Sequence, residues 1–176
     1  LRYLEDDGTP IEPDFFVPVL PMVLINGTEG IGTGFSTFVP PYKPDDVRAN
    51  VARCIRGEEM VPMVPYFNGF EGRVYSTDDG VWVAEGVYAN GVITELPPGR
   101  WTQDHKEFLD GLVESKVISA YENNSTTERV RFKITGYRGK DPTVDLKLRK
   151  TFRLSNVHLF HPVQGIKKYS SPLEII

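Results

Sequence analysis

Prolines and glycines are spread so densely along this chain that they limit the elements it can form. Fourteen prolines and sixteen glycines occur among 176 residues, and the stretches between them are mostly too short for long helices. Hydrophobic residues make up 40% and charged residues 25%, which are the proportions of a globular domain and exclude a disordered or collagen-like chain. We therefore predict an α+β fold, with a mixed, strand-rich body and a few short helices.

Five stretches rich in β-branched and aromatic residues predict strands. They cover residues 81–83, 91–96, 117–121, 129–135 and 151–154. In the fourth stretch, apolar residues alternate with Arg129, Arg131 and Lys133, a pattern typical of a half-buried strand with one cationic face. Trp82 and Trp101 are expected to anchor the core.

Three segments are predicted to be helical. One begins at Pro44, has acidic residues in its first turn and ends at Gly57. The second begins at Thr102, which we interpret as its N-cap. The third begins near Ser171 and is expected to continue beyond residue 176, so we expect a segment of a longer chain. If the body has two lobes, their boundary is expected near residues 97–99.

Charge, cysteine content and hydropathy exclude several classes of function. The net charge is −4 and the pI is near 5.4, so nucleic-acid binding would need a local basic patch rather than bulk positive charge. Cys54 is the only cysteine, which excludes an internal disulfide and a thiolate zinc site and favours an intracellular reducing compartment. The longest apolar run, residues 15–25, is interrupted by Pro18 and Pro21 and is too short to cross a membrane.

The most distinctive local feature is a group of four glycines between Asn26 and Gly34. A phosphate-binding P-loop would need a lysine that this segment lacks, and a dinucleotide-binding fingerprint would need glycine where Phe35 stands. What remains is Ile31, which has glycine on both sides and is free to project. Such a residue can act as a wedge between DNA base steps, or it can fold back into the core as part of a tight turn. The local residues leave both interpretations open.

A longer stretch, from Ile11 to Ser36, ends in PMVLINGTEGIGTGFS and closely resembles the type II (type IIA) DNA topoisomerases of eukaryotes and large DNA viruses. The resemblance continues, in the family's order, through residues 95–97, 100–103, 152–154, 159–160 and 165–169. It implies the tower, or shoulder, segment of the DNA breakage–reunion core. Residues 1–10 would then link to an absent winged-helix domain, residues 11–165 would form the DNA-bending tower, and residues 166–176 would begin the connection to a coiled-coil exit gate.

The resemblance also implies what the parent protein does. Such an enzyme is an ATP-hydrolysing isomerase that relaxes and decatenates double-stranded DNA as a homodimer, by cutting one duplex, passing another through it and resealing the cut. The catalytic tyrosine, the ATP and the Mg²⁺ ions would lie outside this chain, which is expected to hold no catalytic residue and no metal. The protein would be nuclear if cellular, or would act in the host cytoplasm or nucleus if viral. The stretch between residues 104 and 150 is shorter than the same region tends to be in the family, and this favours a viral source.

By the same resemblance, Ile31 is the residue that intercalates and bends the gate duplex. The residues expected to line the DNA near it are Asn26, Gly27, Gly30, Gly32, Thr33 and Gly34. Further candidates for DNA contact are Thr102, Gln103, Arg129, Arg131, Lys133, Lys167 and Lys168, with Arg100 and Lys106 as similar cases.

Several other residues invite a functional assignment that we reject. Arg2 and Tyr3 could be taken for a catalytic pair, but the acidic residues 5–7 follow directly and would repel a phosphate, so Tyr3 is expected to pack. These acidic residues are expected to form a solvated loop rather than a magnesium site. His158 and His161 have a spacing found in metal sites, but no cysteine or suitable acidic residue accompanies them.

Two alternatives to an enzyme segment remain. The first is an architectural module that bends DNA with the same wedge but belongs to no DNA-cleaving enzyme. The second is a noncatalytic scaffold in which the glycine segment is only a turn. The scaffold hypothesis predicts that Ile31 is buried.

Overall fold

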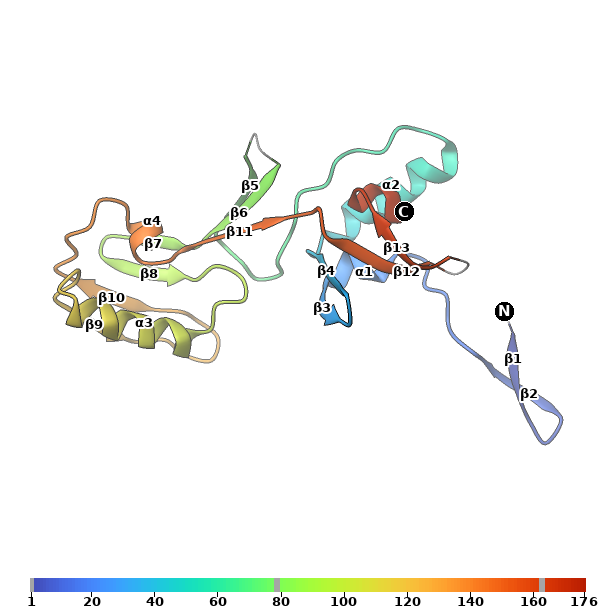
Figure 1. Ribbon diagram of the computed structural model, residues 1–176, viewed down its shortest axis with the longest axis horizontal. Coiled ribbons are helices and arrows are strands. Elements are labelled where there is room, and N and C mark those ends of the chain that lie inside the picture. Colours follow the sequence, from blue (N-terminus) through green and yellow to red (C-terminus); the bar gives the residue numbers. More distant parts are fainter. Residues whose placement is uncertain (1, 78–79, 162–163) are drawn as a thin grey trace.

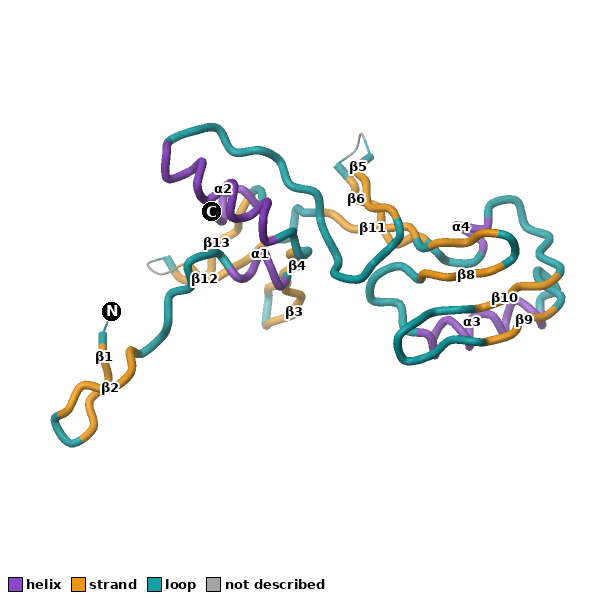
Figure 2. The backbone as a smooth tube through the Cα atoms, turned by 180° about the vertical axis from the view of Figure 1, so that it is seen from behind, coloured by secondary structure: helices purple, strands orange, loops and turns teal. Residues whose placement is uncertain are grey.

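The computed structural model describes residues 2–77, 80–161 and 164–176. The molecule is elongated: the second lobe lies at one end, the first lobe lies in the middle, and an N-terminal hairpin projects from the first lobe to form the other end (Figure 1). Between the lobes lies a three-stranded antiparallel sheet, which we call the connecting sheet. Its strands, in the order β11-β6-β5, are β11 (Arg149–Arg153), β6 (Val81–Glu85) and β5 (Arg73–Ser76). The same arrangement is seen from behind in Figure 2.

The N-terminal hairpin pairs β1 (Tyr3–Asp6) with β2 (Thr9–Pro13). Asp7 and Gly8, both with positive φ, connect the two strands, and Arg2 forms an ion pair of 3.2 Å with Asp14 at the open end. The segment expected to be a linker thus has regular structure. Tyr3 is 57% exposed, so the expectation that it packs is wrong: the described residues near this hairpin offer no core to cover it.

The first lobe combines an early segment of the chain with its last residues. Its elements are α1 (Met22–Asn26), β3 (Thr28–Gly32), β4 (Phe35–Val39), α2 (Pro44–Arg56), β12 (Val157–His161), β13 (Gly165–Tyr169) and the 3-10 helix η1 (Pro172–Ile175). Its core cluster contains Leu24, Val39, Tyr42, Val47, Met63, Val157 and Tyr169, and residues 173, 175 and 176 pack against it. The C-terminal residues therefore belong to this lobe, and the helix expected near Ser171 is a short 3-10 turn.

Helix α2 forms as its sequence predicts. It begins at Pro44 with Asp45 and Asp46 in the first turn, where acidic side chains interact favourably with the positive end of the helix dipole. It ends at Gly57, which has a φ of 69° and donates its N–H to carbonyls of the last turn. The left-handed conformation required at this position is one that glycine adopts most easily. The predicted start and end of this helix are confirmed.

The second lobe is built from the middle of the chain. An antiparallel sheet in the order β7-β8-β10-β9 packs against α3. The elements are β7 (Val87–Ala89), β8 (Val92–Glu95), α3 (Thr102–Glu114), β9 (Ala120–Asn123), β10 (Phe132–Thr135) and α4 (Pro142–Asp145). Leu96 and Leu109 belong to one core cluster, so residues 97–99 connect two parts of this lobe and do not separate two lobes.

Two sequence predictions in the second lobe need correction. Strand β10 begins only at Phe132, so Arg129 and Arg131 precede the strand, although buried Phe132 and exposed Lys133 keep the predicted alternation. The N-cap of α3 is Trp101, which has extended backbone, and no side chain caps this end. Trp101 is 73% exposed. It does not anchor the core.

A buried carboxylate holds the connecting sheet together. Glu85, at the end of β6, accepts hydrogen bonds from Arg73 on β5 at 2.8 Å, from Arg149 on β11 at 2.9 Å and from the Tyr75 hydroxyl at 2.9 Å. Burial raises the pKa of Glu85, but hydrogen bonds from Tyr75, Arg149 and Arg73 outweigh it, so the pKa is lowered overall. The carboxylate therefore stays ionised and links all three strands between the lobes.

His105 is a buried histidine without hydrogen-bond partners. It is fully buried on α3, neither ring nitrogen has a partner among the described residues, and its ring packs 5.3 Å from that of Phe132. Burial, followed by the charges of Arg100 and Lys147, lowers the pKa of His105 to about 4. As the pH falls, the unfolded chain therefore protonates His105 at a higher pH than the folded chain does. The stability present above pH ~6.5 is lost as the pH falls towards 4.

We expect this loss to be about 2 to 3 kcal/mol, and we expect His105→Leu to remove it. The free energy of unfolding, measured by urea titration between pH 4 and pH 7, checks this. His158→Gln is the control, because His158 is only half-buried. A His105→Leu variant that loses as much stability as wild type between pH 7 and pH 4 would contradict the assignment.

Candidate nucleic-acid interface

Ile31 lies near the tip of a tight hairpin. Strands β3 and β4 pair from Thr28 opposite Val39 to Gly32 opposite Phe35, and a two-residue connection joins them. The second residue of that connection is Gly34, with a φ of 81°. Ile31 is 94% exposed. The scaffold hypothesis, which required a buried isoleucine, is therefore wrong.

The glycines around Ile31 do different things. A Cβ atom at Gly30 or Gly34 would meet nothing within 4 Å, and one at Gly32 would come no closer than 3.7 Å to its nearest neighbour. This bare backbone lets a ligand approach closely on either side of Ile31. Gly27 instead follows α1 at a φ of 71°, where a Cβ atom would lie 2.9 Å from the carbonyl oxygen of Val39. Packing within the lobe requires that glycine.

The remaining loop candidates are both exposed. Asn26 is the last residue of α1, and Thr33 is the first residue of the hairpin connection. Thr33 therefore lies at the tip of the hairpin with Ile31, whereas Asn26 precedes the open end of the hairpin and is not brought to the tip.

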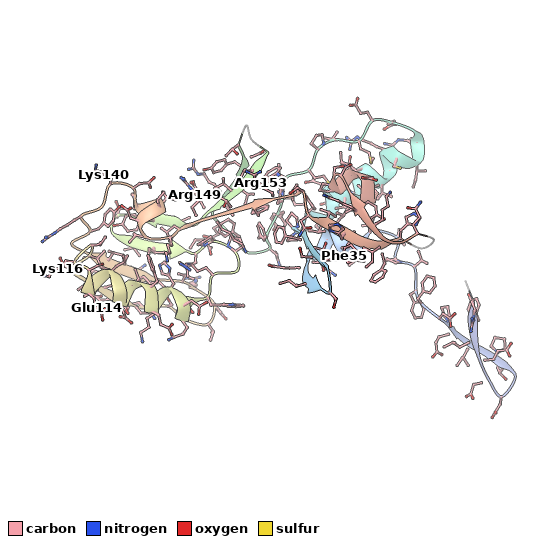
Figure 3. All side chains as sticks on the ribbon, in the orientation of Figure 1. Phe35, Glu114, Lys116, Lys140, Arg149 and Arg153 are labelled. Atoms are coloured by element: carbon pink, nitrogen blue, oxygen red, sulfur yellow. The ribbon has the colours of Figure 1, made fainter. Side chains whose placement is uncertain are left out.

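An apolar groove of about 260 Å³ runs beside Ile31. Its side chains include Phe35, His158, Phe160 and Ile166 from the two hairpins of the first lobe, and Figure 3 labels Phe35 there. Phe160 is 84% exposed and Phe35 is 50% exposed. Sequence analysis missed His158, Phe160 and Ile166 as neighbours of Ile31, because only the packing of β12 beside β4 brings them there.

Hydrogen bonds fix the two hairpins of the first lobe to each other. The Phe38 amide donates to the Asn156 carbonyl at 2.9 Å, and the Asn156 amide group donates to the Ser36 hydroxyl at 2.6 Å. The Nδ1 atom of His158 lies 3.0 Å from the Ser36 carbonyl oxygen. Ser36 stands directly opposite Ile31, so these contacts support the base of the projecting side chain.

Lys167 and Lys168 lie on opposite faces of β13. Lys167 forms an ion pair of 2.9 Å with Glu174, and its ammonium lies over the ring of Tyr169. Lys168 is exposed and stands opposite His158, while the neighbouring pair on this face joins Ile166 and Phe160. Directly paired residues share a face of a sheet, so Lys168 alone lies on the groove side.

We expect Lys168→Gln to lower the slope of log affinity for duplex DNA against log salt by about 0.9, the value for one lost phosphate contact. Lys167→Gln is the control, because Lys167 is held by Glu174 and should leave the slope unchanged. Fluorescence anisotropy of a labelled duplex across a salt series measures both slopes. An unchanged slope for Lys168→Gln would assign this lysine to solvent.

The remaining candidates lie on the second lobe, and the structure does not bring them to the hairpin. Lys133 forms an ion pair of 3.1 Å with Glu122, and Gln103 donates to Glu107 at 3.0 Å along α3. Both are thus engaged within the lobe. The other DNA-contact candidates on this lobe are Arg129, Arg131 and Lys106, which are exposed, and Thr102 and Arg100, which are half-buried.

The described residues contain no group of three or more His, Cys, Asp and Glu side chains placed to hold a metal ion. The acidic residues 5–7 lie exposed on the N-terminal hairpin. None of the helices in the described ranges is long and apolar enough to span a membrane.

The fold corresponds to a segment of a topoisomerase core. A solved structure described as the Plasmodium falciparum topoisomerase II DNA-binding, cleavage and re-ligation domain superposes with a TM-score of 0.85 at 37% identity, covering 99% of this chain and 26% of that one. Residues 1–176 also match the model of the family that comprises the A subunits of DNA gyrase and topoisomerase IV. The chain belongs to this family.

Curated relatives agree with this assignment. The chain is 37% identical to DNA topoisomerase 2 of Pisum sativum and 37% identical to DNA topoisomerase 2 of Plasmodium falciparum, in both cases over its full length. It spans only 13% and 14% of those two proteins. The resemblance drawn from the sequence and the predicted α+β, strand-rich fold are thereby confirmed. Both relatives come from cellular organisms, so they give the expected viral source no support.

Proposed function

We propose that this chain is the part of a type II DNA topoisomerase that holds and bends the gate duplex. The carrying observation is Ile31, a large apolar side chain that is 94% exposed on a rigid hairpin with bare backbone on both sides. Removing this apolar side chain from water would be favourable, but the described residues do not cover it. A gap between two DNA base pairs would cover it.

The wedge would act by unstacking. An apolar side chain inserted between base steps costs a few kcal/mol per step and kinks the duplex. Two features of the structure offset that cost: the apolar groove beside Ile31, and Lys168 on the same face, which would hold a phosphate. Deformable steps would be preferred, because bending them costs less.

The bond-making groups would come from the rest of the parent enzyme. We propose that a tyrosine outside residues 1–176 cuts both strands of the bent duplex, that a second duplex passes through, and that the break is resealed. We also propose that ATP and Mg²⁺ bind to other parts of the parent enzyme. The parent would work as a homodimer in the nucleus, where its substrate lies.

The test uses the full-length parent protein. We expect it to separate interlinked DNA circles in the presence of ATP and to bend a duplex labelled at both ends, measured by energy transfer. Bending without any decatenation would make the chain an architectural DNA-bending module instead. A parent that neither bends nor decatenates DNA would overturn the proposal.

A further inference from the structure

A second cavity, of about 280 Å³, lies in the second lobe between two segments far apart in the sequence. Residues 97–104, which lead into α3, form one side, and residues 147–150, which lead into β11, form the other. Four of its lining residues are cationic, namely Arg100, Lys147, Arg149 and Lys150, and Asp104 is the only acidic one. We call this cavity the basic pocket. It belongs to neither the hairpin nor the apolar groove.

Most of the positive charge in the basic pocket is uncompensated. Arg149 is bound to Glu85, but Arg100, Lys147 and Lys150 form no ion pair among the residues that the structure describes. Arg100 stacks over the ring of Phe108, and its Nε atom is buried without a hydrogen-bond partner. The ammonium of Lys147 lies 4.3 Å from the centre of the same ring. An unpaired buried donor is costly, and an anion would satisfy it.

Two further features favour an anion here. The first turn of α3 begins beside the pocket without a side-chain cap, so its backbone N–H groups add partial positive charge there, which Asp104 in the same turn offsets only in part. His105, one turn into α3, has its pKa lowered by burial and also by the charges of Arg100 and Lys147. The surroundings of the pocket are therefore electropositive in a chain whose net charge is −4.

The pocket lies where an arm of a bent duplex could reach it. In Figures 1 and 2 the connection from β8 to α3 lies at the end of the second lobe that faces the first lobe, which carries the β3–β4 hairpin. Arg149, the first residue of β11, is labelled over the second lobe in Figure 3. The exposed indole of Trp101 precedes α3 on this connection. A duplex that leaves Ile31 towards the second lobe would first meet this end of the lobe, which includes residues 97–100 of the basic pocket.

We propose that the basic pocket binds a backbone phosphate of the gate duplex, on the arm that runs from Ile31 over the second lobe. This inference rests on the proposed function. Arg100, Lys147 and Lys150 would contact phosphate oxygens, which position a duplex without reading its sequence. The contact would hold the bent arm against the protein and so stabilise the bend made at Ile31.

The test uses full-length parent enzyme carrying Lys147→Gln together with Lys150→Gln. The matched control is Lys116→Gln together with Lys140→Gln, which removes the same charge at the far end of the second lobe (Figure 3). Each pair includes one lysine with positive φ, Lys147 at 51° and Lys116 at 60°, so backbone effects are matched. Affinity is measured across a salt series for duplexes of increasing length that share one central bent step.

We expect the pocket variant to lower the slope of log affinity against log salt by about 0.9, only on duplexes long enough to reach the second lobe. The control should match wild type at every length. If the double variant unfolds, Lys150→Gln compared with Lys140→Gln answers the same question.

Three outcomes separate this inference from the proposed function. If wild type bends the duplex, Ile31→Ala does not, and the pocket variant matches its control at every length, the pocket inference fails while the proposed function stands. If wild type does not bend DNA, the proposed function fails and this inference fails with it. If calorimetry shows inorganic phosphate binding that the pocket variant loses, without any change in the duplex slope, the pocket takes a free anion and the inference is overturned.

Discussion

Replacing Ile31 with alanine in the parent enzyme should abolish most gate-duplex bending and lower the rate of DNA cleavage on the order of a hundredfold. Without the inserted isoleucine, the kinked duplex still has an unstacking cost of a few kcal/mol but loses the apolar side chain that fills the opened step, and about 1.4 kcal/mol corresponds to a tenfold change in rate. Stability should change by no more than about 0.5 kcal/mol, because a side chain that is 94% exposed leaves no cavity when truncated. Energy transfer across a labelled duplex measures bending, and a cleavage assay measures the rate.

The chain provides a matched control for this experiment. Ile55 on α2 is 81% exposed and lies outside the hairpin, so Ile55→Ala removes the same atoms without touching the wedge. We expect it to bend and cleave DNA like wild type. Unchanged bending by Ile31→Ala would contradict the role of this residue, while the family assignment would stand. A stability loss as large as that of a core truncation would show that Ile31 packs within the fold.

Glu85→Ala should destabilise the protein by about 3 to 4 kcal/mol. The substitution removes a carboxylate whose side chain is 6% exposed and leaves Arg73, Arg149 and Tyr75 without their shared acceptor. Removing one partner of a buried ion pair is strongly destabilising because the other charge is left uncompensated, although Arg73 can regain water because its side chain is 81% exposed. Chemical denaturation, followed by circular dichroism, measures the loss.

The same cluster predicts an effect of acid. Because the pKa of Glu85 is lower in the folded than in the unfolded chain, the stability that it contributes is present above about pH 4.5 and is lost as the pH falls through the folded-state value. The control for Glu85→Ala is Glu122→Ala, because the ion pair of Glu122 with Lys133 is exposed and such pairs contribute about 0 to 1 kcal/mol to stability. Equal losses for the two variants would mean that the connecting sheet does not depend on its buried carboxylate.

Regular local signals are enough to predict some elements and insufficient for others. Acidic residues after Pro44 and glycine at position 57 predict α2 with its observed ends, and the alternation around Phe132 predicts the faces of β10. The sequence does not predict strand β3, because two of its five residues are glycine and it lacks a strand pattern. It is held as a strand by its pairing with β4. Sequence reasoning misplaces Trp101 because burial depends on what lies opposite a side chain, which the neighbouring residues do not encode.

Sequence alone established the α+β class, the family resemblance, α2, and Ile31 as the residue on which function would depend, because turn chemistry, hydrophobic period and motif order are local properties. Tertiary structure decided that Ile31 projects, that Lys168 and not Lys167 faces the apolar groove, and that residues 97–104 meet residues 147–150 in a basic pocket. Each of these depends on contacts between segments distant along the chain. Such contacts arise only when whole elements pack to bury their apolar faces, and no local pattern contains that information.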